Sequence, residues 1–534
     1  MSLVRVTDLT VEFGDLRAVD GLSLTLERGA ALALVGESGS GKSTVASALL
    51  GLHHGTGARV GGSIEVAGTD VQAASDGELR RLRGAKAAMV FQDPLSSLDP
   101  YYAIGDQIAE VYRVHTRGSR RAARARAVEV LDRVGIPDAR RRSRSRPHEF
   151  SGGMRQRALI AMALACAPEL LIADEPTTAL DVTVQAQILD LLHTLREETG
   201  MGLLLVTHDV GVAAESVDRV LVMRHGRVVE QGPVAAVLGA PAEPYTRELL
   251  SAVPRVDAVR APSQASGEVV LEASGLRREF GRGKRAFAAV DDVSLTVRRG
   301  ETLGVVGESG SGKTTLGRML VGLLEPTAGE VRHDGHARVG VNPAVQMVFQ
   351  DPLSSLNPRR SIGESIADPL RARALRLRGS DEGRIRARVT ELLERVGLEG
   401  AHYERYPHEF SGGQRQRVGI ARALAADPRV IVCDEPVSAL DVTTQAQVVA
   451  LLGELQRELG LALVFVAHDL AVVRQVSDRV AVMRRGRIVE TGTADEVYDH
   501  PQDPYTRQLL AAVPVLDPGA AARRRAARRE LASA

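Results

Sequence analysis

The stretch that decides the fold is ALALVGESGSGKSTVASALL, from Ala31 to Leu50. It opens with an apolar run, passes through a glycine-rich turn and continues with helical spacing. A buried strand that leads through such a turn into a helix surrounds the turn with backbone N–H groups and the positive end of the helix dipole, where phosphate oxygens can bind. The pattern returns at 302–324 as TLGVVGESGSGKTTLGRMLVGLL, so the chain contains this element twice.

Other motifs recur in the same order, which indicates a tandem duplication. They are MVFQDPLSSL at 89–98 and 347–356, PHEFSGG at 147–153 and 407–413, and ALDVT at 179–183 and 439–443. From PHEFSGG onward the copies are 260 residues apart. Within the 534 residues we therefore predict a first domain at 1–255, a linker at 256–268, a second domain at 269–517 and a basic Ala/Arg-rich tail at 518–534.

Two segments lie outside the repeat. Lys42 and Gln92 are 50 residues apart, whereas Lys313 and Gln350 are 37 apart, so the first copy is longer here. We interpret the extra length, which includes the Gly-rich stretch 53–62, as a longer surface loop or hairpin. We expect the tail to be a frayed or weakly helical solvated end, with contact to anionic lipid as the alternative.

Composition excludes several classes of protein. The formal net charge of +1 is not that of a polycation that binds nucleic acid by charge alone. Two cysteines cannot form a disulfide framework or a four-cysteine metal site. No apolar run approaches the roughly 18 residues that span a bilayer, and the first ten residues have no signal-peptide core. We therefore expect a soluble, intracellular protein.

The apolar pattern predicts an α/β core in each half. Short apolar runs at 31–35, 170–173 and 203–206 in the first half, and their counterparts in the second, are typical of a mostly parallel sheet covered on both faces. Segments 104–134 and 362–396 have helical spacing and no strand-like run. Each half is thus expected to be an α/β core with a helical insert.

The turn GxxxxGK[ST] is a P-loop by its residues and context. Lys42 and Lys313 are expected to reach the β and γ phosphates of a nucleotide, while Ser43 and Thr314 offer a hydroxyl to magnesium. The chain has only four lysines among its 68 basic residues, and two of them stand here. A compact ammonium fits a tight phosphate nest in which the planar fork of Arg does not, which supports the P-loop interpretation.

Acidic residues follow a predicted strand in each half. Asp174 and Asp434 fit a second magnesium contact, direct or through water. Glu175 and Glu435 fit the group that polarises an attacking water, because phosphoryl transfer needs an aligned nucleophile and neutralised charge. Two acidic residues that merely cap a strand-end loop are the alternative interpretation.

Two further polar positions complete each set. Gln92 and Gln350 follow the strand-like MVF, and their amides could contact both magnesium and the lytic water. His208 and His468 follow the predicted strands LLLVT and LVFVA, where an imidazole could contact a γ-phosphate. A histidine at a strand end is often only structural, so this assignment depends on the rest of the set.

The motif SGGMRQR at 151–157, with SGGQRQR at 411–417, precedes a predicted helix in each half. It gives each half a second Gly-rich anion site. A second phosphate site in a domain that already has a P-loop suggests that the two sites serve different nucleotides.

The ordered set resembles the nucleotide-binding cassettes of ABC transporters. In that family two cassettes pair head to tail, which implies that each ATP lies between the P-loop of one cassette and the signature of the other, and that Asp181 and Asp441 link the two sites. The resemblance implies two tandem ABC-type P-loop cassettes that bind ATP and Mg²⁺. A short linker would make this pairing intramolecular, at an effective concentration in the mM range.

The site residues implied by the motifs and the resemblance fall into groups. Nucleotide contacts in the first half are Gly36, Glu37, Ser38, Gly39, Ser40, Gly41, Lys42, Ser43, Thr44, Ser151, Gly152 and Gly153. Nucleotide contacts in the second half are Gly307, Glu308, Ser309, Gly310, Ser311, Gly312, Lys313, Thr314, Thr315, Ser411, Gly412, Gly413 and Gln414. Metal contacts are Ser43, Gln92, Asp174, Thr314, Gln350 and Asp434; catalytic residues are Glu175, Glu435, His208 and His468. Phe13 and Phe280 are expected to stack on adenine, with Phe287 competing with Phe280 and a core role open for each.

Within ABC proteins, FQDPLSSLDP, EPYTRELLSAVP and their second copies resemble the dipeptide and oligopeptide importer ATPases. That resemblance implies transmembrane permease partners docked on the helical inserts near Tyr101 and Ser361, an extracytoplasmic substrate-binding protein, and a peripheral position on the cytoplasmic face of the inner membrane. Alternatives are a twin-cassette protein acting on ribosomes, disfavoured by the short linker, and importers of nickel chelates, glutathione or sugars. A DNA-repair cassette is disfavoured by the lack of zinc-binding cysteines.

Overall fold

The two P-loop turns lie in two separate compact units. The computed structural model describes residues 2–178, 180–257, 266–281, 283, 286–337, 339–376, 381–438 and 440–533. The first unit contains 1–180, 184–253 and 514–534, and the second contains 181–183 and 254–513. Most of the predicted linker lies outside the described residues, as do Ala179 and Ala439, which begin the ALDVT motifs.

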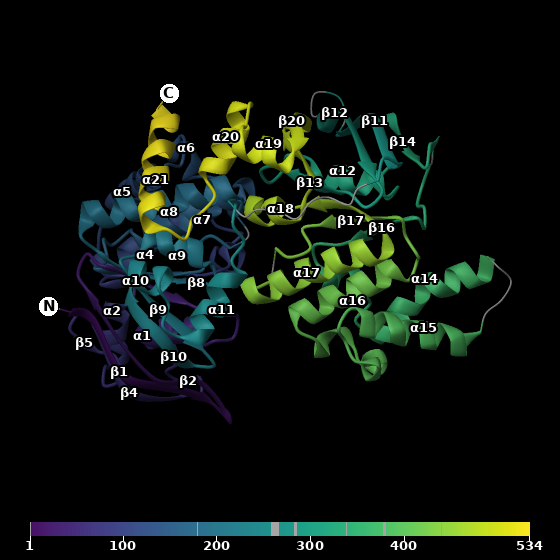
Figure 1. Ribbon diagram of the computed structural model, residues 1–534. Helices are drawn as coiled ribbons and strands as arrows, with labels where there is room; N and C mark the ends of the chain where they lie inside the picture. The colour runs from purple at the N-terminus through teal and green to yellow at the C-terminus, as the bar shows by residue number, and fades with distance from the viewer. Residues whose placement is uncertain are drawn as a thin grey trace. The chain divides into compact units, whose positions relative to one another are not determined.

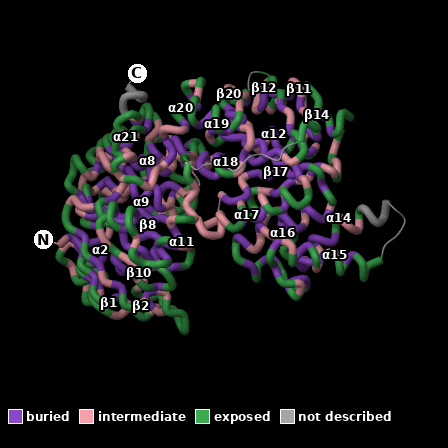
Figure 2. Tube along the Cα trace, in the orientation of Figure 1, coloured by how far each residue is buried: buried purple, intermediate pink, exposed green. Residues whose placement is uncertain are grey.

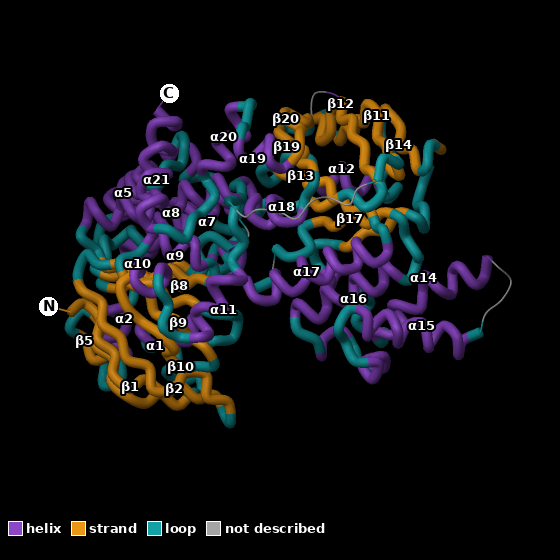
Figure 3. Tube along the Cα trace, in the orientation of Figure 1, coloured by secondary structure: helices purple, strands orange, loops and turns teal. Residues whose placement is uncertain are grey.

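The first unit contains two sheets (Figure 3). A four-stranded sheet has the order β2-β1-β4-β5, and a six-stranded sheet has the order β10-β9-β3-β8-β7-β6. Their strands are β1 (Ser2–Phe13), β2 (Leu16–Glu27), β3 (Ala31–Val35), β4 (Arg59–Val66), β5 (Thr69–Asp70), β6 (Ala87–Val90), β7 (Leu170–Asp174), β8 (Gly202–Thr207), β9 (Arg219–Arg224) and β10 (Arg227–Pro233). The six-stranded sheet is parallel except for the β9–β10 pair, which confirms the predicted mostly parallel core.

Helices cover this sheet and extend from it (Figure 1). They are α1 (Lys42–Leu49), α2 (Asp76–Leu82), α3 (Pro94–Ser97), α4 (Ile104–Thr116), α5 (Arg120–Arg133), α6 (Ala139–Arg142), α7 (Gly152–Ala163), α8 (Val182–Thr199), α9 (Val210–Ser216), α10 (Val234–Gly239), α11 (Pro244–Ala252) and α21 (Pro518–Ser533). Helices α4 and α5 form the predicted helical insert.

The second unit repeats the arrangement, with sheets β12-β11-β14-β15 and β16-β17-β18-β13-β19-β20. Its strands are β11 (Val269–Phe280), β12 (Phe287–Arg298), β13 (Thr302–Val306), β14 (Ala328–His333), β15 (His336–Ala337), β16 (Val345–Val348), β17 (Val430–Asp434), β18 (Ala462–Val466), β19 (Arg479–Arg484) and β20 (Arg487–Thr493). Its helices are α12 (Lys313–Leu320), α13 (Pro352–Ser355), α14 (Ile362–Arg376), α15 (Glu382–Arg395), α16 (Gly412–Leu424), α17 (Val442–Leu459), α18 (Leu470–Val476), α19 (Ala494–Asp499) and α20 (Pro504–Ala511).

Strand β3 shows how the sequence builds the core. All five of its residues are buried, as a continuous apolar run predicts. Figure 2 shows buried positions gathered in the interior of the unit and exposed ones around it. Ala31, Ala33 and Val35 join the core cluster that contains α7, α8 and α9, whereas Leu32 and Leu34 join the cluster that contains α1 and the four-stranded sheet. Both faces are therefore filled, and the strand end that leads into the P-loop is held rigidly.

The extra length in the first half is mostly not the loop that the Gly-rich stretch suggested. Most of it follows β4 and contains α2, which has no counterpart among the described residues of the second unit. Ser75 and Glu78 form a capping box at its start, and Leu79 and Leu82 are fully buried. The prediction of a surface loop or hairpin was thus wrong for this part, because the helix contributes apolar side chains to the core.

The tail also differs from expectation. Residues from Pro518 form the helix α21, which packs against α9 in the first unit. Ala521 on this helix is 2% exposed. The tail is helical, as one form of the prediction had it, but the prediction of a solvated end was wrong because the helix is docked. Among the described residues, none of the helices has both the length and the hydropathy to cross a membrane.

Candidate functional site

The P-loop in each unit is shaped by glycines at positions where a side chain does not fit. Gly41 has φ +97°, and a Cβ there would lie 2.4 Å from the carbonyl oxygen of Ala18. Gly312 has φ +106°, and its Cβ would lie 2.3 Å from the oxygen of Ala289. Each glycine is the residue before a helix, α1 or α12, so the turn brings the backbone to the helix N-terminus at the place where phosphate is expected to bind.

The two P-loop lysines lie in matching cages. Lys42 Nζ donates to the carbonyl oxygens of Gly36 at 2.8 Å and Glu37 at 2.7 Å. Lys313 Nζ donates to those of Gly307 at 2.8 Å and Glu308 at 2.9 Å. Burial lowers the pKa of Lys313, with Glu435 the main opposing charge. These carbonyl groups therefore hold each ammonium within its own P-loop.

Each P-loop hydroxyl pairs with the carboxylate of the Asp-Glu motif. Ser43 Oγ donates to Asp174 Oδ1 at 3.0 Å, and Thr314 Oγ1 donates to Asp434 Oδ1 at 2.9 Å. Burial raises the pKa of both aspartates, although these hydrogen bonds lower it. A hydroxyl and a carboxylate whose charge is disfavoured by burial form a hard-oxygen donor set that fits Mg²⁺, because a cation would stabilise the ionised form.

The glutamate of the motif is held by two other predicted residues. Gln92 Nε2 donates to Glu175 Oε2 at 2.7 Å, and His208 Nδ1 lies 3.2 Å from Glu175 Oε1. In the second unit Gln350 Nε2 donates to Glu435 Oε2 at 2.7 Å, and His468 Nδ1 lies 3.3 Å from the same oxygen. The structure therefore joins three motifs that lie on different strands into one cluster in each unit.

The electrostatics of this cluster are reciprocal. Burial raises the pKa of Glu175 and of Glu435, but the hydrogen bond and charge of the partner histidine outweigh it, so that each pKa lies below its ordinary value. Burial likewise lowers the pKa of His208 and of His468, yet the glutamate and the adjacent Asp raise it above its ordinary value. Both pairs thus favour imidazolium and carboxylate.

Backbone strain also positions the glutamates. Glu175 and Glu435 each have φ +46°, in the left-handed region that residues other than glycine rarely adopt. Such a conformation costs about 1–3 kcal/mol and is kept where the surroundings fix it. Here the amide of Glu175 donates to Val206 O and that of Glu435 to Val466 O, both at 2.9 Å, which ties the strained residue to the neighbouring strand.

The signature motifs begin helices α7 and α16. Ser151 Oγ accepts from the amide of Met154, and Ser411 Oγ accepts from that of Gln414, each at 3.3 Å. The bonds of these serines lie within their own helix caps, whereas the P-loop, Asp-Glu, Gln and His residues cluster within each unit. Both caps are exposed, so the N-terminal amides of the helices are open to an anion.

Two family models match this chain. The model for the ABC transporter matches residues 19–178 and 290–438, and the model for the C-terminal region of the oligopeptide/dipeptide transporter matches 229–275 and 489–533. The chain belongs to the ABC transporter family. It is an importer ATPase of the oligopeptide/dipeptide type, it binds ATP with Mg²⁺ and hydrolyses it, and the predicted pair of tandem ABC cassettes is confirmed.

Curated relatives resemble the chain over almost its full length. The glutathione import ATP-binding proteins GsiA of Salmonella choleraesuis (strain SC-B67) and Escherichia coli (strain K12) are each 48% identical over 548 residues, which cover 94% of this chain and 87% of the relative. Among solved structures, the dimeric structure of MJ0796, a bacterial ABC transporter cassette, is 29% identical and covers 43% of this chain and 98% of that chain, with a TM-score of 0.39. Importer ATPases of this family work with membrane permeases and a substrate-binding protein.

The aromatic residues predicted to stack on adenine differ between the two ABC cassettes. Phe13 is 39% exposed and meets His53 edge-on, with ring centroids 5.4 Å apart. Phe280 contacts Phe287 at 5.9 Å and lies under the guanidinium of Arg278. Phe13 is exposed and Phe280 is half-buried, and their role with adenine stays a prediction.

Two contacts in the ABC cassettes were not foreseen from the motifs. Thr178 Oγ1 donates to Glu175 Oε2 at 2.9 Å. In the second cassette the backbone amide of Glu308, in the P-loop, donates to the hydroxyl of Tyr505 at 3.0 Å, and burial raises the pKa of this tyrosine to about 12. Tyr505 lies in the DPYTR run that indicated the importer branch, which is the one signal that could have pointed to it.

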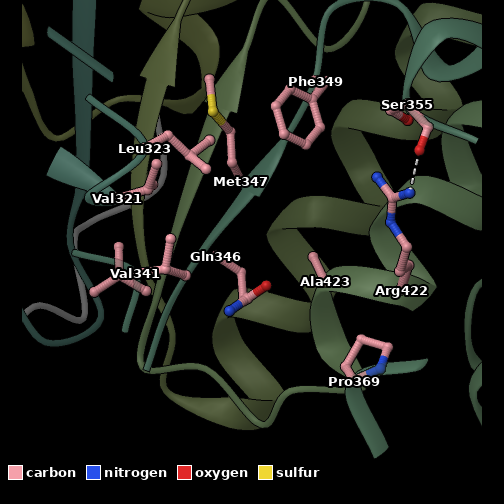
Figure 4. Close-up of a pocket in the computed structure, with 11 residues that line it drawn as sticks. Val321, Leu323, Val341, Gln346, Met347, Phe349, Ser355, Pro369, Arg422 and Ala423 are labelled. Carbon is pink, nitrogen blue, oxygen red and sulfur yellow. Dashed lines mark hydrogen bonds between the residues drawn. The ribbon is translucent and has the colours of Figure 1, made fainter. Parts of the chain in front are cut away.

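A cavity of about 480 Å³ lies in the second ABC cassette, between its core and its helical insert (Figure 4). One wall is apolar, and the opposite wall comes from α14 and α16, where Arg422 donates to the carbonyl of Ser355. Its lining residues are Val321, Leu323, Val341, Val345, Gln346, Met347, Phe349, Ser355, Pro369, Arg422 and Ala423. The cavity adjoins the strand that leads to Gln350, so an occupant would lie next to the catalytic cluster.

Proposed function

We propose that this chain energises the import of small peptides, with glutathione-like peptides as the first class to test. The observation that carries the proposal is the match of both C-terminal regions to the oligopeptide/dipeptide model, together with 48% identity to proteins named for glutathione import. The complete cluster in both cassettes supports it further, since both halves have the residues for hydrolysis.

The roles of the cluster residues follow from their contacts. MgATP would supply the phosphoryl group and the charge that offsets the buried aspartates. Ser43 and Asp174, with Thr314 and Asp434, would hold the metal, assisted by the amides of the glutamines. The glutamate of each cluster would orient and deprotonate water, and its histidine partner would hold the glutamate carboxylate in place. Lys42 or Lys313 would neutralise charge on the phosphates.

We further propose that the ATP sites are crossed. One site would combine the P-loop of Lys42 with the signature 411–413, and the other would combine the P-loop of Lys313 with the signature 151–153. Membership of the ABC transporter family supports this pairing, because the resemblance to that family implies that two cassettes pair head to tail. Binding of ATP would then favour a closed pair of cassettes and hydrolysis an open one, because only the closed state contacts the nucleotide from both sides.

Site-resolved nucleotide trapping tests the crossing. With a photoreactive ATP analogue and peptide mapping of the labelled P-loop, Ser151→Arg should reduce labelling near Lys313 and spare Lys42. Ser411→Arg is the matched variant and should do the reverse. The opposite pattern, in which each variant damages the P-loop of its own cassette, would refute the crossed arrangement.

The surfaces next to the glutamine residues support docking of permease subunits. In the second cassette the cavity beside Gln350 has the size and apolar wall to take side chains of a short helix. In the first cassette Phe91, Tyr101 and Tyr102 are exposed at the start of the helical insert. Exposed aromatic side chains are typical anchors of protein interfaces. Permeases bound there would place the chain on the cytoplasmic face of the inner membrane.

Reconstitution tests the substrate class. The chain would be assembled in proteoliposomes with the permease and binding-protein products of adjacent genes, and ATP turnover measured with dipeptides, glutathione, longer peptides, nickel chelates and sugars. We expect stimulation by short peptides that depends on the binding protein. Stimulation only by a sugar or a nickel chelate, or activation only by ribosomes, would overturn the proposal.

A further inference from the structure

The C-terminal helix α21 is part of the first unit and lies beside α8 (Figure 1). Helix α21 contacts α9, and its Ala521 is almost fully buried. The segment that leads into it passes Gly211 on α9, where a Cβ would approach Pro514 to 3.0 Å. The helix is therefore seated closely, and a glycine makes room for its approach.

Two arginines of α21 make polar contacts with the first unit. Arg528 donates to Asp190 through Nη2 at 3.1 Å and Nε at 3.3 Å, and its Nη2 lies 3.5 Å from Glu215 Oε2. Arg525 Nη1 lies 3.1 Å from His193 Nε2, and the same guanidinium donates to the backbone oxygen of Glu215. The side chains of Arg525 and Arg528 are only 17% and 10% exposed, so these are largely desolvated, charge-assisted contacts.

The residues that receive α21 are specific to the first cassette. We call Asp190, His193, Gly211 and Glu215 the acidic receptor. At the positions 260 residues later, the second cassette has Ala450, Gly453, Ala471 and Gln475. Both acidic residues and the histidine are thus replaced, and the glycine that gives room for the approach becomes alanine. The duplicate shows that the cassette fold itself does not need these four residues.

The burial of Glu215 favours a cationic partner, which stabilises the ionised form of its carboxyl group. Its side chain is 2% exposed, and burial raises its pKa to about 7, against the lowering effect of Arg528 and Arg525. A buried carboxylate without a cationic partner is strongly unfavourable. Within the described residues the cations at hydrogen-bond distance from Glu215 come from α21, which makes the receptor and the helix complementary parts.

We propose that the acidic receptor is a docking site for the chain's own C-terminal helix and that α21 acts as a clasp. The segment after the second cassette is thereby anchored on the first, so that the second cassette is held at both ends of its chain, by the linker and by the clasp. Separation of the cassettes is then limited by two tethers, which raises their effective concentration for pairing. This inference is independent of the transported substrate.

Hydrogen–deuterium exchange of the intact chain without nucleotide tests the clasp. We expect the amides of 519–528 to be protected in the wild type, because an isolated helix of this length is marginal in water. The double variant R525E/R528E should speed their exchange on the order of 100-fold, the effect of breaking buried ion pairs. R523E is the matched control, since Arg523 is exposed on the same helix, and it should leave the exchange unchanged.

A second variant tests the clasp by substitutions in the acidic receptor. D190A/E215Q gives the first cassette the residues of its duplicate, and it should release α21 while the cassette stays folded. Equal exchange in the wild type and in R525E/R528E would overturn the proposal, as would an equal effect of R523E. Protection of 519–528 that arises only when vesicles containing phosphatidylglycerol are added would also overturn it, in favour of a lipid contact.

Discussion

The two cassettes are nearly identical at the expected nucleotide site and differ at the start of their helical inserts, where partner proteins are expected to dock. The distance from P-loop hydroxyl to Asp is 3.0 Å in the first and 2.9 Å in the second, and the Gln–Glu bond is 2.7 Å in both. By contrast, Tyr101 and Tyr102 of the first insert correspond to Arg359 and Arg360 of the second. The chain therefore combines duplicated chemistry with unlike outer faces.

That difference fits a complex with two unlike partners. In the second insert Arg360 pairs with Asp368 at 2.6 Å and with Glu364 at 3.1 Å, so its charge is used within the cassette. In the first insert the tyrosines are exposed. The first insert thus presents exposed tyrosines where the second has arginines, so the two inserts offer unlike surfaces for docking.

The prediction with the largest expected effect tests whether the two cassettes hydrolyse ATP equally well. Glu175→Gln with Glu435→Gln should lower ATP turnover about 10²- to 10⁴-fold and leave ATP binding in place, because each glutamate is placed to act as the base. If the cassettes are equivalent, each single variant should lower turnover by the same factor. Steady-state phosphate release and equilibrium nucleotide binding measure this.

The matched control for this comparison is Glu198→Gln, which removes a charge from the exposed end of α8 and should leave turnover unchanged. Turnover at the wild-type rate in the double variant would contradict the assignment of both glutamates. A large effect from only one of the single variants would instead show that the two sites are unequal in spite of their common geometry.

The second prediction concerns α2, which only the first cassette has. Leu82 is fully buried, so Leu82→Ala should lower the free energy of unfolding by about 2–5 kcal/mol. Arg80→Ala on the exposed side of the same helix should stay within about 0.5 kcal/mol. Calorimetry of the intact chain would measure both, and equal stability of Leu82→Ala and Arg80→Ala would show that α2 is not part of the core.

The sequence contained a signal for α2 that the loop interpretation overlooked. Ser75 followed three residues later by Glu78 is a capping-box pattern, and the structure contains both of its hydrogen bonds. The four-stranded sheets were not predicted either. Strand β1 alternates imperfectly because its pairing with β2 shifts between Leu9 and Val11, which interrupts the two-residue period.

The features that could be predicted from the sequence follow from local patterns, whereas those that could not depend on contacts between residues far apart in the chain. Strand β3 and helix α1 follow from continuous local patterns, and the motif order was sufficient to group Gln92, Glu175 and His208. The clasp depends on contacts between residues 310–338 positions apart, such as Arg528 with Asp190, and no local pattern specifies which distant surface a basic helix will find.

The third prediction uses pH to compare the two Glu–His pairs. Because Glu435 raises the folded pKa of His468 and His468 lowers that of Glu435, the pair contributes stability that is fully present between their ordinary values, about pH 4.5 and about pH 6.5. This stability is lost as pH rises through the raised histidine pKa. The destabilisation by Glu435→Gln should therefore shrink over this window. Denaturant unfolding at a series of pH values measures it.

Glu175→Gln is the comparison variant and should show the same trend, because the contact with Glu175 raises the pKa of His208 in the same way. In histidine NMR spectra of the nucleotide-free protein, each variant should lower the pKa of its own partner histidine and leave the other unchanged. A pKa that stays raised in Glu435→Gln would contradict the contact between Glu435 and His468.

The smallest expected effect concerns the signature helices. Both start with a serine cap, but only Gln414 returns a hydrogen bond, its Oε1 accepting from the amide of Ser411 at 3.0 Å. Met154 stands in its place in the first cassette and has no oxygen for this bond. Met154→Gln should therefore stabilise the first turn of α7 by about 0.5–1 kcal/mol, and Gln414→Met should destabilise that of α16 by a similar amount.

Hydrogen exchange of the first-turn amides of α7 and α16 measures the effects of both substitutions in one chain. If the capping box is the relevant difference, hydrogen exchange should slow in α7 of Met154→Gln and accelerate in α16 of Gln414→Met. In the double variant, α7 should then be the better protected of the two helices. Unchanged exchange in both would mean that the signature caps are equal despite their sequences. In that case the contrast between the cassettes would lie in their outer surfaces, the acidic receptor and α2.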